Sequence, residues 1–345
     1  MTTLPTTSSP DSAQASPARS GGSPRISVAL CTFNGARFLE AQLASYLVQT
    51  RPPDELVVCD DGSTDETLTI LARFEQRASF PVRIVRNVER LQTTKNFEKA
   101  IGLCTGELIA TSDQDDVWLP EKLAVSEVAM ASSTRCGLVF TNAEIVDEDL
   151  RSEGHYMWDS IQFGPWARRQ VRRGHGFEVL LRQWVVTGAT MMFRSELRPF
   201  VLPIPASWTH DGWIAFIIGA LAEVRFVERS TLKYRQHAAQ QIGGKKHTWK
   251  ELYRRARETG PAYFRLAHER FLLSQERLQS HASRMRDPRF LHLVDQKVEH
   301  QRRRLAIAEA SSRWQRVVWS LGEMGRGRYC RYSPDLLHFI KDMLL

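Results

Sequence analysis

Between Arg25 and Phe140 the chain alternates short apolar runs with segments whose apolar residues recur at helical spacing. Runs of this length suit buried strands, and the segments between them suit amphipathic helices. Strands separated by helices predict βαβ crossovers and a mostly parallel sheet in an α/β fold. The expected strands are 26–31, 55–60, 82–86 and 108–112, and the expected helices are 36–48, 64–76 (N-cap Ser63 or Thr64), 94–103 and one that opens at Pro120.

Polar clusters follow three of these expected strands. They are Thr32-Phe33-Asn34, Asp60-Asp61-Gly62-Ser63 and the segment from Ser112 to Asp116. Ligands of open parallel sheets bind beyond the carboxyl ends of the strands. The three clusters are therefore expected to share one ligand-binding edge.

The last cluster places three carboxylates, Asp113, Asp115 and Asp116, within four positions. Like charges at this spacing repel and raise a pKa unless a positive group lies among them. A hard divalent cation, Mg²⁺ or Mn²⁺, is the simplest such group. The alternative is an acidic turn that caps the following helix.

Beyond residue 140 the alternation is less regular. Strands are expected at 137–141, 187–193, 224–228 and 231–235, followed by a mainly helical region. A chain of 345 residues suits one large domain with an appendage, or two domains. Residues 1–24 are rich in Ser, Thr, Pro, Ala and Gly and are expected to be a disordered tail.

Composition also bears on the compartment. No stretch reaches the roughly 18–20 consecutive apolar residues of a membrane span, and the N-terminus lacks the pattern of a secretory signal. The five cysteines contain no C-x-x-C pair, so neither a disulfide framework nor a zinc site is expected. A reducing cytoplasm fits best.

Positive charge is concentrated in residues 245–345, which hold 22 Lys and Arg against 11 Asp and Glu, whereas the preceding residues have a net charge of −3. Basic helices with aromatic residues suit an anionic membrane surface. The alternative is a helical bundle packed on the rest of the chain. No nucleic-acid partner is expected, because no recognised binding motif accompanies the charge.

Residues 25–240 resemble the family-2 inverting glycosyltransferases of the GT-A fold, and more closely the bacterial rhamnosyltransferase-like members. The resemblance is carried by the order and spacing of the segments ISVALCTFNGARFLEAQLASYLVQT, ELVVCDDGSTDET, KNFEKAIGLCTGELIATSDQDDVWLPEKL, VVTGATMMF, HDGWIA and YRQH. It implies a GT-A nucleotide-diphospho-sugar transferase domain over 25–244, with a mostly parallel central sheet flanked by helices. A basic helical C-terminal region, 245–345, would follow.

The resemblance also implies a donor site. Thr32 and Asn34 would lie against the nucleotide, Asp60 would accept the imide N–H of uracil or thymine, and Asp61 would lie near the ribose. Asp113 and Asp115 match the D-x-D pair, with Asp115 on the metal and Asp113 on the ribose or a metal-bound water. His237 would complete the metal shell, and Lys95 or Arg90 would assist the diphosphate. The alternatives are a turn role for Asp60, a solvated Lys95 and a surface His237.

On the acceptor side, Asp211 matches the catalytic base, which would deprotonate the acceptor hydroxyl opposite the leaving group. The alternative is that His210 or Asp211 only caps the helix 212–221. Thr187 and Gly188 would approach the acceptor, and Trp213 or Trp208 would be an apolar platform for a sugar unless these rings belong to the core. Many family members carry an acidic residue where this chain has His210.

The expected reaction is metal-dependent, inverting transfer from a UDP- or dTDP-sugar, with dTDP-rhamnose as the leading donor. The acceptor would be a glycan, in one version lipid-linked, in the synthesis of a cell-surface polysaccharide such as O-antigen. The expected location is the cytoplasm or the inner face of the plasma membrane. The rival functions are another nucleotide-dependent transferase, such as a nucleotidyltransferase, and a non-catalytic scaffold with the same fold.

Overall fold

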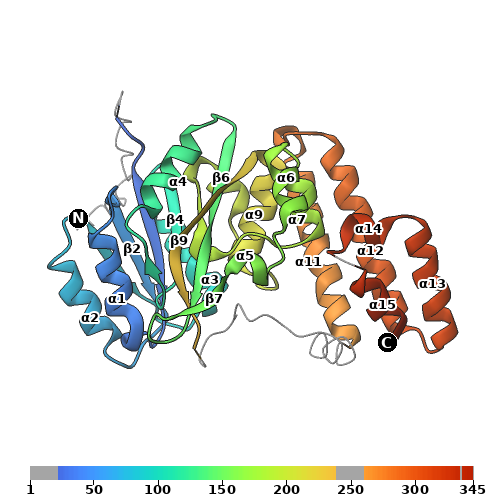
Figure 1. Cartoon of the computed structure of the whole chain (residues 1–345), viewed down its shortest axis with the longest axis horizontal. Helices are drawn as coiled ribbons and strands as arrows, with labels where there is room; N and C mark the ends of the chain where they lie inside the picture. The colour runs from blue at the N-terminus through green and yellow to red at the C-terminus, as the bar shows by residue number, and fades with distance from the viewer. Residues whose placement is uncertain (1–21, 238–259, 335, 345) are drawn as a thin grey trace, which may run out of the picture.

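The computed structural model describes residues 22–237, 260–334 and 336–344. This part of the chain folds into one sheet with helices on both faces, and the helices α11 to α15 stand at the end opposite α1 and α2 (Figure 1). The strand order is β3-β2-β1-β4-β8-β6-β9-β5, with β7 paired to β6. The chain is therefore an α/β protein, as expected.

The first half of the sheet is parallel. Strand β1 pairs in parallel with β2 and β4, and β2 pairs in parallel with β3. The predicted crossovers are therefore confirmed. The elements are β1 (Ile26–Thr32), α1 (Ala36–Leu47), β2 (Glu55–Asp60), α2 (Thr67–Glu75), β3 (Val82–Arg86), α3 (Gln92–Leu103) and β4 (Leu108–Ser112).

Helix α2 begins at Thr67, three residues later than expected. The side chain of Asp65 accepts hydrogen bonds from the Thr67 backbone N–H (3.1 Å) and hydroxyl (2.5 Å). The predicted cap, Ser63, instead donates its hydroxyl to Asp60 (2.5 Å). The residues between β2 and α2 thus form a hydrogen-bonded loop, and the cap prediction is wrong.

The second half of the sheet is mixed. Strand β8 is antiparallel to both β4 and β6, whereas β6 and β9 are parallel. The late strands expected at 224–228 and 231–235 are one strand, β9. The elements are β5 (Val117–Trp118), α4 (Lys122–Ala131), β6 (Cys136–Val146), β7 (Ser152–Tyr156), α5 (Met157–Ser160), α6 (Pro165–Arg172), α7 (Gly176–Arg182), the 3₁₀ turn η1 (Gly188–Thr190), β8 (Met191–Arg194), η2 (Ser195–Leu197), α8 (Arg198–Val201), α9 (His210–Leu221) and β9 (Glu223–Arg235).

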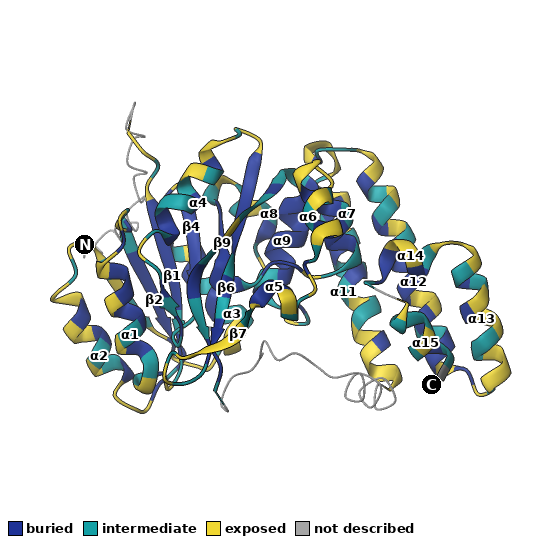
Figure 2. Ribbon diagram, viewed as in Figure 1, coloured by how far each residue is buried: buried dark blue, intermediate teal, exposed yellow. Residues whose placement is uncertain are grey.

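The C-terminal helices share the main hydrophobic core. Buried Phe271 of α11 and Phe290 of α12 belong to the same cluster as Phe177 of α7 and Phe216 of α9. Burial thus runs without a break from the sheet region into these helices (Figure 2). The helices are α11 (Pro261–Ser280), η3 (Ala282–Arg284), α12 (Arg289–Glu309), α13 (Arg313–Gly325), α14 (Arg328–Tyr332) and α15 (Leu337–Leu344).

Part of the basic region lies outside the described residues, including the pairs Lys245-Lys246 and Arg254-Arg255, and so does nearly all of the tail expected at 1–24. Among the helices that the structure describes, none combines the length and the apolarity that crossing a membrane requires.

Candidate active site

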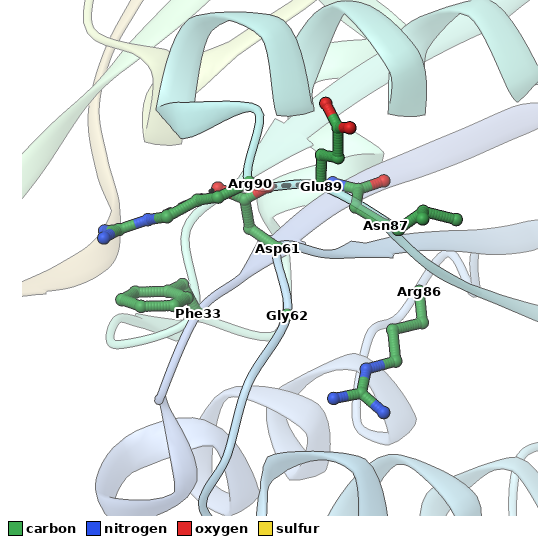
Figure 3. Close-up of a pocket in the computed structure, with 8 residues that line it drawn as sticks. Phe33, Asp61, Gly62, Arg86, Asn87, Glu89 and Arg90 are labelled. Atoms are coloured by element: carbon green, nitrogen blue, oxygen red, sulfur yellow. Dashed lines mark hydrogen bonds and ion pairs between the residues drawn. The ribbon is translucent and has the colours of Figure 1, made fainter.

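A cleft of about 530 Å³ opens at the carboxyl ends of the first strands (Figure 3). Phe33, Asp61, Gly62 and the segment 86–90 line it. The guanidinium carbon of Arg90 lies 3.8 Å from the centre of the Phe33 ring, and Arg90 Nε is 3.9 Å from Asp61 Oδ2. The cleft therefore combines an aromatic face, a carboxylate and a cation. Phe33 was not singled out by the sequence, although it stands between the two residues that were.

Asp60 and Asp61 have different surroundings. Asp60 is fully buried, and its carboxylate accepts hydrogen bonds from the hydroxyls of Thr32 (2.8 Å) and Ser63 (2.5 Å) and from the Ser63 backbone N–H (2.8 Å). Asp61 is in the cleft wall, where it accepts from the backbone N–H groups of Leu91 (2.6 Å) and Gln92 (2.9 Å). Asp60 thus closes the loop, and Asp61 is the carboxylate that borders the cleft.

Two other residues that were expected to bind the nucleotide-sugar donor contact other groups of the protein. The Asn34 side-chain oxygen accepts the Thr64 backbone N–H at 2.9 Å. The Lys95 ammonium is paired with Glu98 at 2.8 Å. In this structure Asn34 joins two loops, and Lys95 is engaged along its own helix.

A side chain that the sequence did not single out connects the cleft to the acidic loop. Gln114 accepts the Phe33 backbone N–H (2.9 Å) and donates to the Phe33 carbonyl (3.1 Å). A Cβ atom on Gly35 would lie 2.2 Å from the Gln114 side-chain oxygen, so a larger residue there would push Gln114 away from Phe33. Only the position of Gln114 among three aspartates could have pointed to it.

The acidic loop lies against the end of β9. Strand β5 pairs antiparallel with β9, with Val117 opposite Lys233. Asp115 precedes Val117 by two residues, and Arg235 follows Lys233 by two, so these residues also meet. The Arg235 side chain donates to the Asp115 carbonyl (2.7 Å). His237 Nε2 then lies 2.7 Å from Asp115 Oδ2, and its ring packs on Phe38. Two residues expected on a metal are therefore neighbours.

The surroundings of Asp113 and Asp116 in this loop disfavour their charged forms and raise their pKa values. Burial, followed by the negative charges of Asp115 and Asp211, raises the pKa of Asp113 to about 7. Burial likewise raises the pKa of Asp116, whose Oδ1 accepts the Arg235 backbone N–H (3.1 Å) while Oδ2 has no hydrogen-bond partner. Asp116, which the sequence left unassigned, thus anchors β9 to the loop.

Lys122, which the sequence did not identify, is a positive group that lowers the pKa values of Asp113 and Asp116. Its ammonium is buried and donates to the Ala189 carbonyl at 2.7 Å. Burial lowers the pKa of Lys122 to about 7, and the charges of Asp116 and Asp113 oppose that shift. Lys122 therefore relieves the repulsion only in part and also holds the turn η1.

The fit to a divalent cation is partial. Among the described residues, no three acidic, histidine or cysteine side chains converge into a complete metal site. Asp115 and His237 supply an oxygen and a nitrogen donor, and the unpartnered oxygen of Asp116 lies in the same loop. The residues fit a cation whose remaining ligands come from substrate and water.

Asp211 bridges α9 and η1. Its Oδ2 accepts the Gly188 backbone N–H (3.0 Å), and its Oδ1 accepts that of Gly212 (2.7 Å). His210 lies beneath them, stacked on Phe97 with 3.8 Å between ring centres, and burial lowers its pKa although Asp211 opposes the shift. A Cβ on Gly188 would lie 2.5 Å from His210 Nε2. Gly188 is thus required by the His210 ring beneath it.

The expected aromatic platform is not at Trp213 or Trp208. These side chains are 0% and 2% exposed, and their indole N–H groups donate to the carbonyls of Val201 and Arg270. The exposed tryptophan nearby is Trp184, at 43%, with the Arg270 guanidinium over its ring. Trp184 borders a shallow apolar depression with Gly212 and Phe216. Thr187 is close in sequence, and its hydroxyl bonds to that of Thr190 (2.9 Å).

Residues 27–197 match the family model "Glycosyl transferase family 2". An uncharacterized glycosyltransferase of Nostoc sp. is 27% identical over 62% of this chain and 66% of its own length. The putative glycosyltransferase EpsE of Bacillus subtilis is 28% identical over 36% and 45%. The dTDP-rhamnosyl transferase RfbG of Shigella flexneri is 25% identical over 62% and 73%. The chain thus spans about half to two thirds of the length of most of these relatives.

Among solved structures, TarS 1-349 of S. aureus matches with a TM-score of 0.54 at 12% identity, over 92% of this chain and 81% of that one. Its complex with UDP-GlcNAc gives a TM-score of 0.52 at 14% identity, over 92% and 88%. The mannosyltransferase PcManGT of Pyrobaculum calidifontis, in complex with GDP-Man and Mn2+, gives 0.50 at 17% identity, over 94% and 87%. At these identities the likeness establishes the fold, which is that of the GT-A glycosyltransferases.

Proposed function

We propose that this chain, whose residues 27–197 form a Glycosyl transferase family 2 domain, transfers a sugar from a pyrimidine nucleoside-diphosphate sugar to a glycan hydroxyl with inversion. The observation that carries the proposal is the convergence of three features at one edge of the sheet. They are the cleft with Phe33 and Asp61, the Asp115–His237 pair and the Asp211 carboxylate.

The donor base would lie in the cleft. The Arg90 guanidinium, a flat group, rests on the Phe33 ring at 3.8 Å, which is the stacking position that a pyrimidine would take. Asp61 borders the same space and would accept the imide N–H of uracil or thymine. An ionised carboxylate has about four acceptor sites, and Leu91, Asn87 and Gln92 use three of them. We therefore assign the base contact to Asp61, with Thr32, Asn34 and Asp60 shaping the loops around it.

Two features support a UDP- or dTDP-linked donor. The cleft pairs an aromatic face with a carboxylate acceptor, and the similar proteins include one named as a dTDP-rhamnosyl transferase and one solved with UDP-GlcNAc. Among these donors, dTDP-rhamnose remains the leading sugar. A similar protein named as the putative teichuronic acid biosynthesis glycosyltransferase TuaG of Bacillus subtilis supports a cell-surface glycan as the product.

Asp115 and His237 would hold Mg²⁺ or Mn²⁺, and Asp113 would support the donor ribose or a water. When bound, the cation neutralises the negative charge that grows on the departing nucleoside diphosphate. Arg235 keeps Asp115 in place through its bond to the Asp115 carbonyl. The cation would also offset the charges of Asp115 and Asp211, which add to the effect of burial in raising the pKa of Asp113.

Asp211 would act as the general base. The acceptor oxygen attacks the anomeric carbon as the bond to the diphosphate oxygen breaks, and the hydroxyl proton passes to Asp211. The Gly188 and Gly212 N–H groups fix the carboxylate, and the neutral His210 ring fills the space behind it. The exposed face of Trp184 beside Gly212 would receive a ring of the acceptor glycan.

The test combines a donor panel with a base variant. Wild-type protein is titrated by calorimetry with UDP-, dTDP- and GDP-sugars, with and without Mn²⁺. With the donor that binds, Asp211→Asn should lower transfer by about 10²-fold or more while donor affinity is retained. Asp149→Asn, at an exposed carboxylate in another loop, is the control. Wild-type rates in Asp211→Asn would refute the base assignment, and no binding of any nucleotide sugar would favour a scaffold.

A further inference from the structure

Helix α13 buries a stripe of polar side chains and exposes a stripe of apolar ones, the reverse of an ordinary amphipathic helix. Its inner stripe consists of Arg316, Ser320 and Glu323, at positions i, i+4 and i+7. Ser320 is 0% and Glu323 1% exposed. The opposite stripe has the same spacing and holds large apolar side chains: Trp314 is 75%, Val318 47% and Leu321 54% exposed. Soluble helices usually bury the apolar stripe and expose the polar one.

The inner stripe is fixed by specific polar contacts. Glu323 Oε1 accepts the Arg328 guanidinium (3.1 Å), and Glu323 Oε2 lies 3.3 Å from His300 Nδ1 of α12. The Arg316 guanidinium donates to the Ala310 carbonyl at 2.7 Å. These contacts set the rotation of α13 and leave the Trp314 stripe exposed. The helix itself lies at the edge of the molecule (Figure 2).

The exposed charge from α13 onward has one sign. Among the described residues from 313 onward, the carboxylates are Glu323 and Asp342, and both are buried. Asp342 is held by Arg304 in two hydrogen bonds (2.6 and 2.8 Å). The exposed charged residues of the same stretch are Arg313, Arg326 and Arg331. Asp335 lies outside the described residues.

We propose that the outer face of α13 docks on an anionic lipid surface. Tryptophan with neighbouring aliphatic side chains suits the boundary between headgroups and acyl chains, and flanking arginines are attracted to anionic headgroups. A second copy would fit this face poorly, because a twofold pairing of α13 would place arginines of both copies together. The helix is thus the proposed contact within the basic C-terminal region. The terminal stretch contributes less, since Asp342 and the Phe339–Tyr329 contact tie α15 into the helical bundle.

The experiment is cosedimentation of the full chain with two kinds of vesicle. One is phosphatidylcholine alone, and the other is equal parts phosphatidylcholine and phosphatidylglycerol. We expect binding to the mixed vesicles, weaker binding to phosphatidylcholine, and loss of the difference in about 1 M salt. The double variant Trp314→Ser/Leu321→Ser should bind the mixed vesicles roughly tenfold more weakly.

The matched controls also replace exposed apolar side chains by serine, but on other helices. Trp166→Ser (44% exposed, on α6) and Val128→Ser (70% exposed, on α4) should bind the mixed vesicles like the wild type. Circular dichroism checks that each variant is folded. Equal binding by the α13 variant and the wild type would overturn the proposal, and so would a dimer that the α13 variant abolishes in sedimentation velocity. The assay uses neither donor nor acceptor, so its outcome is independent of the proposed transfer reaction.

Discussion

His237 Nε2 lies 2.7 Å from Asp115 Oδ2, although the two residues are 122 positions apart in the chain. The antiparallel pairing of β5 with β9 causes this approach, because Val117 lies opposite Lys233. The acidic loop leads directly into Val117, and His237 follows Lys233 by four residues. The proposed cation would therefore draw two of its ligands, a carboxylate and an imidazole, from side chains that already lie side by side.

His237→Ala should weaken the Mn²⁺-dependent binding of UDP or dTDP by roughly tenfold or more, as when a metal site loses a supporting side chain. Calorimetry with and without Mn²⁺ measures the difference. Nucleotide binding without metal should change little, because the cleft around Phe33 is formed by other segments. His175→Ala, at an exposed histidine on another surface, is the control. Unchanged Mn²⁺ dependence would remove His237 from the cation site.

Phe33→Ala should weaken UDP binding roughly tenfold, since stacking of a base on an aromatic ring contributes about 1–3 kcal/mol. The loop should keep its shape, because Gln114 bonds to the backbone of residue 33 and not to its ring. Val88→Ala removes apolar atoms from the same cleft at a fully exposed side chain and should bind like the wild type. If both variants bind UDP equally well, the base does not stack on Phe33.

The parts of the fold that local pattern determines were predictable. Strands β1, β2, β3 and β4 and their helices follow from apolar spacing, and their parallel pairing follows from the crossovers. The presence of one edge with three polar clusters also follows, because strand ends are fixed by the same pattern. The helix start at Thr67 was missed because a side-chain bond from Asp65 competes with the helix there.

The roles within each cluster depend on contacts that sequence spacing does not encode. Asp60 and Asp61 are adjacent and chemically identical, yet the Ser63 and Thr32 hydroxyls bind the first, and the second borders the cleft. Lys122 and Gln114 act through partners more than 60 residues away, Ala189 and Phe33. Tryptophan was expected as a platform, but which tryptophan is exposed depends on how α9 packs against α11.

Gly188→Ala should lower transfer while leaving donor binding intact. The added methyl would lie 2.5 Å from His210 Nε2, and the His210 ring cannot retreat because Phe97 is stacked behind it. The turn η1 must then shift, which carries the Gly188 N–H away from Asp211. Overpacking of this kind costs about 1–3 kcal/mol of stability.

The control for this variant is Gly164→Ala, whose Cβ would meet nothing closer than 3.9 Å. The double variant Gly188→Ala/His210→Ala should recover part of the lost stability, because the clash is between these two side chains. Thermal unfolding and transfer assays on the set measure both effects. Additive losses in the double variant would show that His210 is not the obstacle.

Trp184→Ala should raise the acceptor KM by roughly tenfold with a smaller change in kcat, the pattern expected when ground-state binding is lost. The ring is 43% exposed beside Gly212, so its removal leaves the core intact. Trp184→Phe should restore most of the affinity, and Trp166→Ala, at an equally exposed tryptophan on α6, should match the wild type. An unchanged acceptor KM in Trp184→Ala would place the acceptor elsewhere.

The stability of the C-terminal helices should depend on pH through His300. This side chain is fully buried, and burial lowers its pKa to about 4, an effect that Arg304 and Lys297 increase and the bond to Glu323 opposes. Its unfolded pKa is about 6.5. Between these values the unfolded chain binds a proton that the folded chain does not, so stability falls as the pH drops, by up to about 3 kcal/mol.

His300→Gln should remove this part of the stability loss, measured by urea unfolding between about pH 7 and pH 4.5. His292→Gln, at an exposed histidine of the same helix, should leave it in place. If His300→Gln and the wild type lose the same stability over this range, the acid sensitivity arises from other groups.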